Sequence, residues 1–471
     1  MTDAIERLTL VQAADAIARG ELSSEKLTEH ALSRLARIGL TLNCLVAIHA
    51  DSARAAAREA DQRRARGETL GPLHGVPLAH KDIFYRAGQL SEGGSKIRRG
   101  FVPNETATVL SRLDAAGALD LGRLQMAEFA LSPTGYNEHN GHVRNPWSLE
   151  HVPGGSSSGS GAAVAARLIY ASLGTDTGGS IRHPSAMCGL TGIKPTWSRV
   201  SRASAMALSW TLDCVGPLAR TARDCARMLR IIAGHDSRDA TSANLPVPDY
   251  EAALTGDLRG VRIAVPRTYY YDHVTPEVAA CFAESLKVLQ SRGATIVDSK
   301  APDMAIINSM MHLVMSTEAA TIHRVWLTER PQDYAAQVRQ RIEPGLYYPA
   351  VRYLEALSLR AKLTQEWLAA AMGDADLVHL PTLSIPVPSI KETTEGEPAA
   401  IGAAIGVITH CTRGINYLGL PSASVPGGFV DGRPVGFQLV GRPFAEATVL
   451  RAADAYQRDT AWHDAVPPAA A

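Results

Sequence analysis

The sequence predicts an α/β fold in which helices pack on the faces of a β-sheet. Short apolar runs typical of buried strands, such as 171–174 and 261–265, alternate with longer helical segments such as 277–291. Clusters of glycine and proline separate these segments, as turns between regular elements do. The chain of 471 residues is long enough to bury a large core between such a sheet and its helices.

The first 70 residues are expected to be helical. Leu27, Ala31 and Leu35 recur at helical spacing, and the alanine- and arginine-rich stretch 51–66 ends at Gly67. Downstream, the patterns predict helices at 107–116, 162–169 and 277–291, strands at 118–121, 171–174, 261–265, 294–297, 422–425 and 435–440, and a mostly helical stretch at 304–372 that is interrupted near Pro344 and Gly345.

The composition excludes several classes of protein. Lysine plus arginine and aspartate plus glutamate number 47 each, so the chain lacks the basic footprint of a nucleic-acid binder. The six cysteines show no Cys-x-x-Cys spacing, which favours buried thiols in a reducing compartment. No segment resembles a signal peptide or reaches the length of a membrane span. We therefore expect a cytoplasmic protein that binds neither nucleic acid nor membrane.

Two Gly/Ser-rich segments, 153–161 and 174–182, are the most distinctive feature of the sequence. Such runs are usually flexible linkers, but a linker is not expected to lead directly into a helix and a buried strand. A phosphate loop is excluded because Ser160 and Gly161 stand where lysine and Ser/Thr are required. A third interpretation is catalytic, because backbone N–H groups beside a serine, as at 177–180, form an oxyanion hole next to a nucleophile.

A serine nucleophile also needs a base. Several of the fifteen histidines lie near these segments, but no spacing singles one out. Lys81, at the end of the apolar run 76–79, which we expect to be a short strand, could act as the base if burial lowers its pKa. On the residues alone Lys81 remains only one candidate, because a lone lysine is usually a surface residue.

Together these motifs resemble the amidase signature family over nearly the whole chain. The segment 71–82 is similar to the family segment with the catalytic lysine, 153–159 to the loop with the bridging serine, and 173–185 to the nucleophile loop. Further similar segments follow in the family's order at 189–196, 212–221, 412–421 and 434–441. The order and spacing of several rare motifs support the resemblance.

The resemblance implies a role for each motif residue. Ser180 would be the nucleophile, Ser156, preceding a cis peptide bond, would relay the proton, and Lys81 would be the final base. The N–H groups of Thr177, Gly178, Gly179 and Ser180 would form the oxyanion hole, with Asp176 and Ser157 in support. The resemblance implies neither a metal nor an organic cofactor, and the sequence has no His-Glu-x-x-His motif or cysteine-rich cluster.

One residue beside the proposed base departs from the family pattern. His80 stands where the family usually has an aliphatic residue. Its imidazole would either perturb Lys81 or bond a backbone carbonyl, and the sequence leaves both open.

The resemblance also implies a fold of one α/β/α domain with a large mixed sheet. We expect it over residues 1–466, with an N-terminal helical part at 1–70, the signature core at 71–220, a variable substrate-facing region at 235–375, strands and a helix at 376–466, and a disordered tail at 467–471.

The substrate pocket is expected near the nucleophile loop and in the variable region. Its candidate residues are Gln125, Met126, Phe129, Ile181, Trp210, Met311 and Arg341. Methionine and aromatic side chains are more often core than pocket, but if these residues line the site it is apolar and suits aryl or alkyl amides. The same chemistry would extend to carbamates and esters. We expect a small-molecule amide or carbamate substrate and a monomer or homodimer.

Two other functions are weighed. The A subunit of a tRNA-dependent glutamine amidotransferase shares the catalytic residues, would work with partner chains and should hydrolyse glutamine, and Arg341 offers a weak match to its substrate site. An inactive binding scaffold is disfavoured, because it would need none of Lys81, Ser156 and Ser180, and all three are present.

Overall fold

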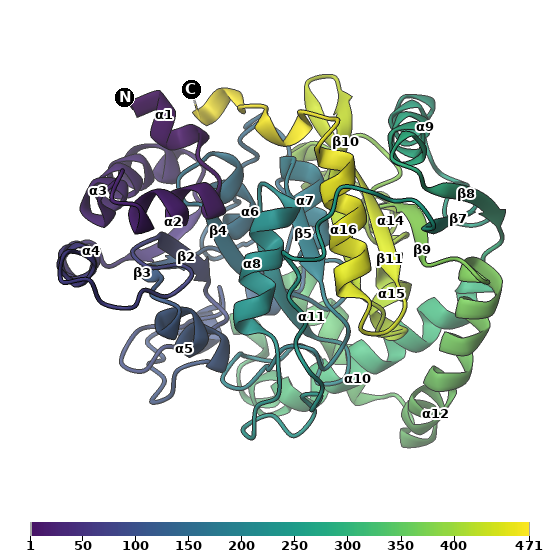
Figure 1. Ribbon diagram of the computed structural model, residues 1–471. Helices are drawn as coiled ribbons and strands as arrows, with labels where there is room; N and C mark the ends of the chain where they lie inside the picture. The colour runs from purple at the N-terminus through teal and green to yellow at the C-terminus, as the bar shows by residue number, and fades with distance from the viewer. Residues whose placement is uncertain (1, 471) are drawn as a thin grey trace.

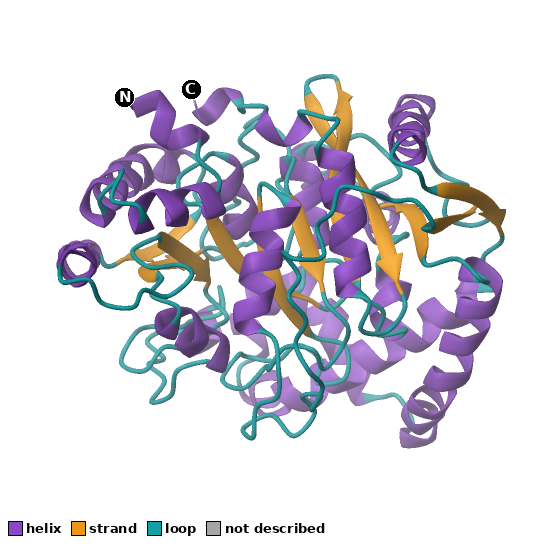
Figure 2. Cartoon of the chain, viewed as in Figure 1, coloured by secondary structure: helices purple, strands orange, loops and turns teal. Residues whose placement is uncertain are grey.

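The computed structural model describes residues 2–470 and contains a large sheet flanked by helices (Figures 1 and 2). Within these residues, eight strands form a sheet in the order β4-β6-β5-β10-β11-β9-β7-β8, and three form a small sheet in the order β1-β3-β2. In the large sheet β7 is parallel to β8 and β9, whereas the other neighbouring strands are antiparallel. The predicted α/β class with a large mixed sheet is therefore confirmed.

The strands are β1 (Leu45–Ile48), β2 (Pro77–Lys81), β3 (Leu119–Leu124), β4 (Ala171–Asp176), β5 (Thr191–Lys194), β6 (Cys214–Ala219), β7 (Arg262–Pro266), β8 (Thr295–Ser299), β9 (Leu377–Pro381), β10 (Ser422–Val430) and β11 (Arg433–Gly441). The helices are α1 (Thr2–Arg7), α2 (Leu10–Ala18), α3 (Ser24–Arg34), α4 (Ala50–Ala65), α5 (Thr108–Ala115), α6 (Ser158–Ala165), α7 (Arg182–Cys188), α8 (Ala222–Ile232), α9 (Pro276–Ser291), α10 (Met304–Glu329), α11 (Ala336–Ile342), α12 (Ala350–Trp367), α13 (Ile390–Thr394), α14 (Pro398–Thr409), α15 (Arg413–Tyr417) and α16 (Glu446–Gln457).

Helices cover both faces of the large sheet. α8 and α16 pack against each other and against β5, β6, β10 and β11, and they lie in front of the sheet in Figure 1. α6 and α7 pack on the opposite face, against β4, β5, β10 and β11. α10 packs against both α11 and α12 beside the sheet, and a cavity lies between these helices and the region of α15.

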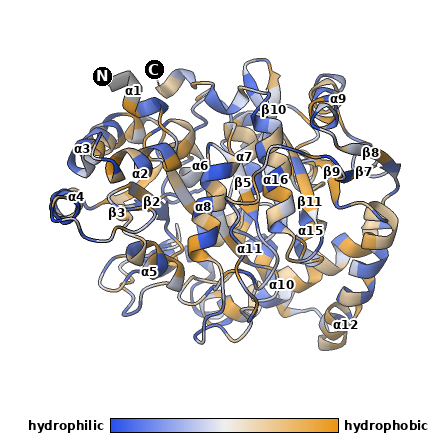
Figure 3. Cartoon of the chain, in the orientation of Figure 1, coloured by the Kyte–Doolittle hydropathy of each residue, from blue (hydrophilic) through white to orange (hydrophobic). Residues whose placement is uncertain are grey.

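The peripheral helix α4 packs on the rest of the fold through a narrow apolar face. α4 is mainly hydrophilic around its circumference in Figure 3. Its buried residues are Ala53, Ala57 and Ala60, which form a stripe of small side chains at helical spacing. This stripe lets α4 pack closely against α3.

The Gly/Ser-rich run is part of a buried helix and not a linker. α6 begins at Ser158, four residues earlier than predicted, and every residue from Ser158 to Ala165 is buried. A Cβ at Gly159 would lie 2.6 Å from the backbone nitrogen of Gln125, so only glycine fits there. Small side chains therefore allow the helix to pack tightly beside the site.

Four strands were not predicted: β1, β5, β6 and β9. β5 and β6 lie fully buried inside the sheet, although their sequences Thr-Gly-Ile-Lys and Cys-Val-Gly-Pro-Leu-Ala contain residues that are rare in strands. A Cβ at Gly216 would lie 2.1 Å from the carbonyl oxygen of Ile193, which explains one of these glycines.

The C-terminal segment differs from the predicted disordered tail. Residues 468–470 form a short 3₁₀ helix, and Ala470 is buried. The Ala470 carbonyl accepts a hydrogen bond from Nη2 of Arg34 at 2.8 Å, which ties this segment to α3. Residue 471 lies outside the described residues. No helix among residues 2–470 has the length and apolar character needed to cross a membrane.

Candidate active site

Three separate segments of the chain carry the predicted catalytic residues. Lys81 ends β2, Ser156 lies just before α6, and Ser180 lies in the loop between β4 and α7. Nζ of Lys81 lies 2.8 Å from Oγ of Ser156 and 2.8 Å from Oγ1 of Thr175. Lys81 and Ser156 are completely buried, whereas Ser180 keeps 8% of its surface exposed. Only Ser180 of the three therefore reaches the surface of a cavity.

The environment of Lys81 favours its neutral form. Burial lowers the pKa of its ammonium group to about 7, although the carboxylates of Asp213 and Asp176 act in the opposite direction. Near neutral pH a large fraction of Lys81 is therefore an uncharged amine, which can accept a proton from the Ser156 hydroxyl.

Ser156 has the unusual backbone that the sequence suggested, with one difference. The cis peptide bond joins Gly155 to Ser156, so it precedes Ser156 and does not follow it. The Ser157 N–H donates to the Ser180 carbonyl at 3.3 Å, and the Ser157 hydroxyl donates to the Thr175 carbonyl at 3.3 Å. Among the hydrogen bonds of residues 2–470 none joins the Ser156 and Ser180 hydroxyls, so that step of the relay stays a prediction.

Asp176 organises the loop that carries Ser180. Its carboxylate accepts hydrogen bonds from the N–H groups of Gly179 and Ile181, at 2.7 and 3.1 Å. It also forms a fully buried ion pair with Arg182, 3.1 Å apart. Burial alone would raise the pKa of Asp176, but Arg182 together with Lys194 and Asn416 outweighs burial and holds that pKa well below its usual range. The carboxylate is thus a permanent anion that fixes the loop.

Three of the four predicted oxyanion-hole amides are available. The Gly179 N–H already donates to Asp176, so it serves the loop and not a bound oxyanion. In the part of the chain that the structure describes, the N–H groups of Thr177, Gly178 and Ser180 donate to no protein acceptor. These three amides, beside the Ser180 hydroxyl, can receive the negative charge of a tetrahedral intermediate.

Gly179 is required by space as well as by conformation. Its φ of 134° lies in a region that favours glycine, and a Cβ there would lie 2.2 Å from Cε1 of His183. His183 in turn lies 2.8 Å from Oγ1 of Thr412, and the Thr412 hydroxyl donates to the Gly178 carbonyl at 2.7 Å. The nucleophile loop is therefore held against the segment that leads into α15.

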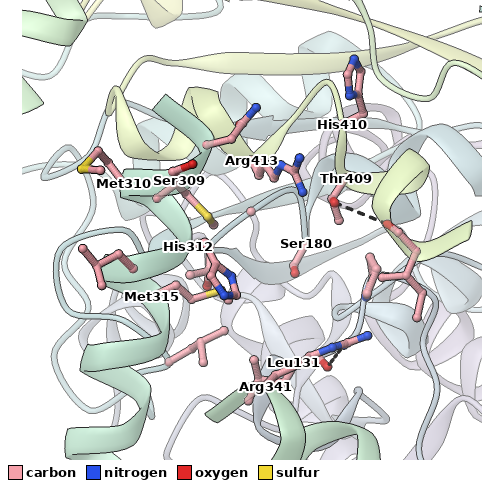
Figure 4. Close-up of a pocket in the computed structure, with 18 of the residues that line it drawn as sticks. Leu131, Ser180, Ser309, Met310, His312, Met315, Arg341, Thr409, His410 and Arg413 are labelled. Atoms are coloured by element: carbon pink, nitrogen blue, oxygen red, sulfur yellow. Dashed lines mark hydrogen bonds between the residues drawn. The ribbon is translucent and has the colours of Figure 1, made fainter. Parts of the chain in front are cut away.

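Ser180 opens into a cavity of about 870 Å³ (Figure 4). Its walls come from the nucleophile loop, the segment 130–133, α10, α11 and the region of α14 and α15. Of the predicted pocket residues, Met311 and Arg341 line it. The sequence singled out neither Arg413 nor His312 as pocket residues, although both also line it. Only the position of Arg413, next to Thr412 in a family-like segment, offered a signal in the sequence.

Three predicted pocket residues point into the core instead. The Gln125 side chain donates to the backbone carbonyls of Asn43 and Gly141, at 2.9 and 3.2 Å. Met126 is fully buried in the main hydrophobic core. Phe129 packs against a cluster of rings on α10 and the following segment.

Ile181 and Trp210 also lie away from the large cavity. Ile181 is completely buried beneath the nucleophile loop, where its amide bonds Asp176. Trp210 is 47% exposed and borders a separate cavity of about 300 Å³. A residue near the nucleophile in sequence thus need not face the substrate.

His80 takes a third role that the sequence did not suggest. Its Nδ1 accepts a hydrogen bond from the Leu173 N–H at 3.1 Å. Burial lowers the pKa of His80 to about 3, so the ring is neutral. It supports β4 and adds no charge beside Lys81.

The chain is similar to known proteins over nearly its whole length. The model of the family described as Amidase matches residues 26–450. The A subunit of glutamyl-tRNA(Gln) amidotransferase from Chloroflexus aggregans is 40% identical, covering 98% of both chains, and that of Pseudomonas aeruginosa is 40% identical, covering 98% of this chain and 99% of its own.

Solved structures are similar over comparable lengths. One, described as "An unexpected vestigial protein complex reveals the evolutionary origins of an s-triazine catabolic enzyme", has a TM-score of 0.89 and 32% identity, covering 96% of this chain and 98% of its own. A bacterial aryl acylamidase of the amidase signature family has a TM-score of 0.88 and 25% identity, with 98% of both chains covered. The glutamyl-tRNA(Gln) amidotransferase A subunit from Thermotoga maritima has a TM-score of 0.80 and 29% identity, covering 97% of this chain and 95% of its own.

These relatives overturn one prediction. We expected a small-molecule substrate, no nucleic acid, and a monomer or homodimer, but the relatives' name contains both a tRNA and the word subunit. The prediction rested on the balanced net charge of the chain, and net charge does not describe the charge of any one surface.

Proposed function

The chain belongs to the amidase family, and we propose that it cleaves the C–N bond of an amide by transferring the acyl group to Ser180. The observation that carries this proposal is the buried contact of 2.8 Å between Nζ of Lys81 and Oγ of Ser156, beside the cavity that exposes Ser180. A lysine with a pKa of about 7 is suited to act as a base.

The reaction would begin with a proton relay. Neutral Lys81 takes the proton of Ser156, Ser156 takes the proton of Ser180, and Oγ of Ser180 attacks the amide carbon. The N–H groups of Thr177, Gly178 and Ser180 stabilise the oxyanion. The proton returns through Ser156 to the leaving nitrogen, the C–N bond breaks, and water hydrolyses the acyl-enzyme by the same relay.

Covalent labelling tests this chemistry. A fluorophosphonate probe should modify Ser180, and peptide mapping by mass spectrometry should find the adduct there. The Ser180→Ala variant should lose both labelling and amide hydrolysis while it remains folded by circular dichroism. Labelling of another serine in the native chain would refute the assignment.

The first candidate setting is the A subunit of a tRNA-dependent amidotransferase. Supporting this candidate are relatives of that name, 40% identical over 98% of this chain. The chain would then release ammonia from glutamine and act with partner chains. The test is to combine the purified chain with the other subunits of the Pseudomonas aeruginosa enzyme and charged glutamyl-tRNA(Gln). Glutamine-dependent formation of glutaminyl-tRNA supports the candidate, and failure to replace the native A subunit counts against it.

The second candidate is cleavage of an amide that carries a carboxylate. One observation favours it: no aspartate or glutamate of the described residues lines the cavity, whereas Arg341, Arg352 and Arg413 do. The same acyl transfer would extend to carbamates and esters. We also propose that residues 1–466 form one domain and that the protein acts in the cytoplasm.

A further inference from the structure

We propose that Arg413 and Arg341 form a carboxylate-binding subsite in the cavity, and that the amide cleaved there carries a carboxylate on its acyl chain and no ammonium group. The inference rests on the amide cleavage proposed for Ser180 and adds the chemical class of the substrate. It begins from the positions of the two guanidinium groups, which lie on different sides of Ser180 in Figure 4.

Arg413 is fixed next to the nucleophile loop. Its neighbour Thr412 donates its hydroxyl to the Gly178 carbonyl at 2.7 Å, and Arg182 donates to the Thr412 carbonyl at 3.1 Å. A Cβ placed on Gly178 would lie 3.8 Å from Cβ of Arg413. The Arg413 side chain therefore starts at the wall of the oxyanion hole and extends into the cavity.

Arg341 reaches the cavity from the opposite wall. It lies near the end of α11, and its Nη1 donates to the Leu131 carbonyl at 2.6 Å. Burial lowers the pKa of its guanidinium. The hydrogen bond to Leu131 fixes the position of the Arg341 guanidinium. Arginine has five N–H donors, so the donors that Leu131 does not use remain for a ligand.

The positive charges of the two arginines are not balanced by protein carboxylates. Arg352, the third arginine of the cavity, pairs with Glu355 at 2.6 Å. Within residues 2–470, neither Arg413 nor Arg341 takes part in an ion pair, and no acidic residue lines the cavity. The electrostatic fields of both arginines reach His312 in the cavity wall. Burial lowers the pKa of His312, and the charges of Arg413 and Arg341 lower it further.

An anion is the ligand that this arrangement favours. A partly desolvated guanidinium is stabilised by a carboxylate, which it can bind through two parallel hydrogen bonds. Nε of Arg413 is buried and has no hydrogen-bond partner among the described residues, so a donor there remains for a ligand. The opposite charge is disfavoured, because an ammonium group would face two cations and find no carboxylate.

Three matched amides test the inference. Glutaramate carries a carboxylate at the far end of its chain, glutamine adds an ammonium group beside that carboxylate, and pentanamide has neither. We expect kcat/KM for glutaramate to exceed those for glutamine and pentanamide by about 10- to 100-fold, as expected for a hydrogen-bonded charge pair. Glutaramate should also slow fluorophosphonate labelling of Ser180 at lower concentrations than glutamine or pentanamide does. This second measurement does not depend on turnover.

Two variants with a matched control assign the effect to the arginines. Arg413→Met and Arg341→Met should each remove most of the preference for glutaramate over pentanamide while fluorophosphonate still labels Ser180. Arg339→Met is the control, because Arg339 lies on the same helix as Arg341 and pairs with Glu343 outside the cavity. It should leave the preference unchanged.

The outcomes separate the inference from the proposed function. If glutamine or pentanamide matches glutaramate in kinetics and in protection, the substrate class is wrong while Ser180 chemistry stands. If Arg413→Met keeps the full preference, Arg413 is not part of the subsite. If Ser180 is not labelled at all, the proposed function itself fails.

Discussion

Acidification should switch the enzyme off by protonating Lys81. Burial lowers the pKa of this residue to about 7. From that value, roughly a tenth of Lys81 is neutral at pH 6 and roughly nine tenths at pH 8. Because only the neutral amine accepts a proton from Ser156, kcat/KM should rise about tenfold between these two pH values. The assay is initial-rate release of ammonia from an active amide, with buffers overlapped at each pH.

The Asp213→Asn variant tests whether Lys81 is the group whose titration causes the loss of activity at acidic pH. Asp213 accepts hydrogen bonds from the Thr177 hydroxyl at 2.6 Å and from the N–H groups of Leu208 and Ser209, and asparagine can retain contacts at both places. The Asp213 carboxylate raises the pKa of Lys81, against the larger effect of burial. Removing its charge should therefore shift the acid limb to lower pH. Since Asp176 also faces Lys81, a limb should persist in the variant.

Two results would refute this reasoning. A profile that is flat from pH 6 to 8, measured where substrate ionisation is constant, would show that Lys81 is not the base that titrates. A shift of the limb to higher pH in Asp213→Asn would contradict the sign of the electrostatic effect. Circular dichroism at each pH excludes unfolding as the cause of any loss.

Three further substitutions test other parts of the site. Ser156→Ala should lower kcat by about 10²-fold or more, because general acid–base relays contribute at least this much, while labelling of Ser180 by fluorophosphonate becomes slower. Gly179→Ala should lower kcat by about 10²-fold, because the new Cβ would lie 2.2 Å from His183, and Gly402→Ala, which meets no atom within 4 Å, should not. Lys81→Met should abolish turnover. Since the substitution removes a buried amine, it should raise the melting temperature at pH 7 by a few degrees in calorimetry. A lower melting temperature would contradict the argument that burial of this amine is unfavourable.

The residues alone indicated the loop around Ser180, whereas the roles of Lys81 and Ser156 came from the family resemblance and stay predictions. Gly179 needs both a positive φ and a position without a Cβ, and such needs leave a recognisable glycine pattern around Ser180. Asp176 and Arg182 form a buried ion pair six residues apart, so their contact is nearly local. Local constraints of this kind survive in sequence, and they located the nucleophile loop.

The pocket could be predicted only in part: Met311 and Arg341 line it, but the other walls depend on how distant segments turn. Phe129 and Ala130 have φ values of 48° and 64°, a left-handed conformation that residues other than glycine rarely adopt. This turn directs Phe129 toward the rings of His323 and Trp326, while Ala130 lines the cavity. No periodic pattern marks such a turn. The sequence therefore placed Phe129 in the pocket wall, whereas the side chain packs in the core.

Chemistry and substrate choice are therefore encoded in different parts of the chain. The contacts of Lys81 and Ser156 arise from β2 and the start of α6, next to the central sheet, whereas Arg341 and Arg413 come from helices far along the sequence. Similarity to the amidotransferase relatives covers 98% of the chain, but 40% identity leaves room for the charges of the cavity wall to differ while the loops of Ser156 and Ser180 stay the same. Since a partly buried guanidinium is stabilised by an opposite charge, the arginines constrain the substrate more directly than overall similarity does. A preference for an acidic amide over glutamine would thus separate this chain from the named activity of its relatives without changing a single catalytic residue.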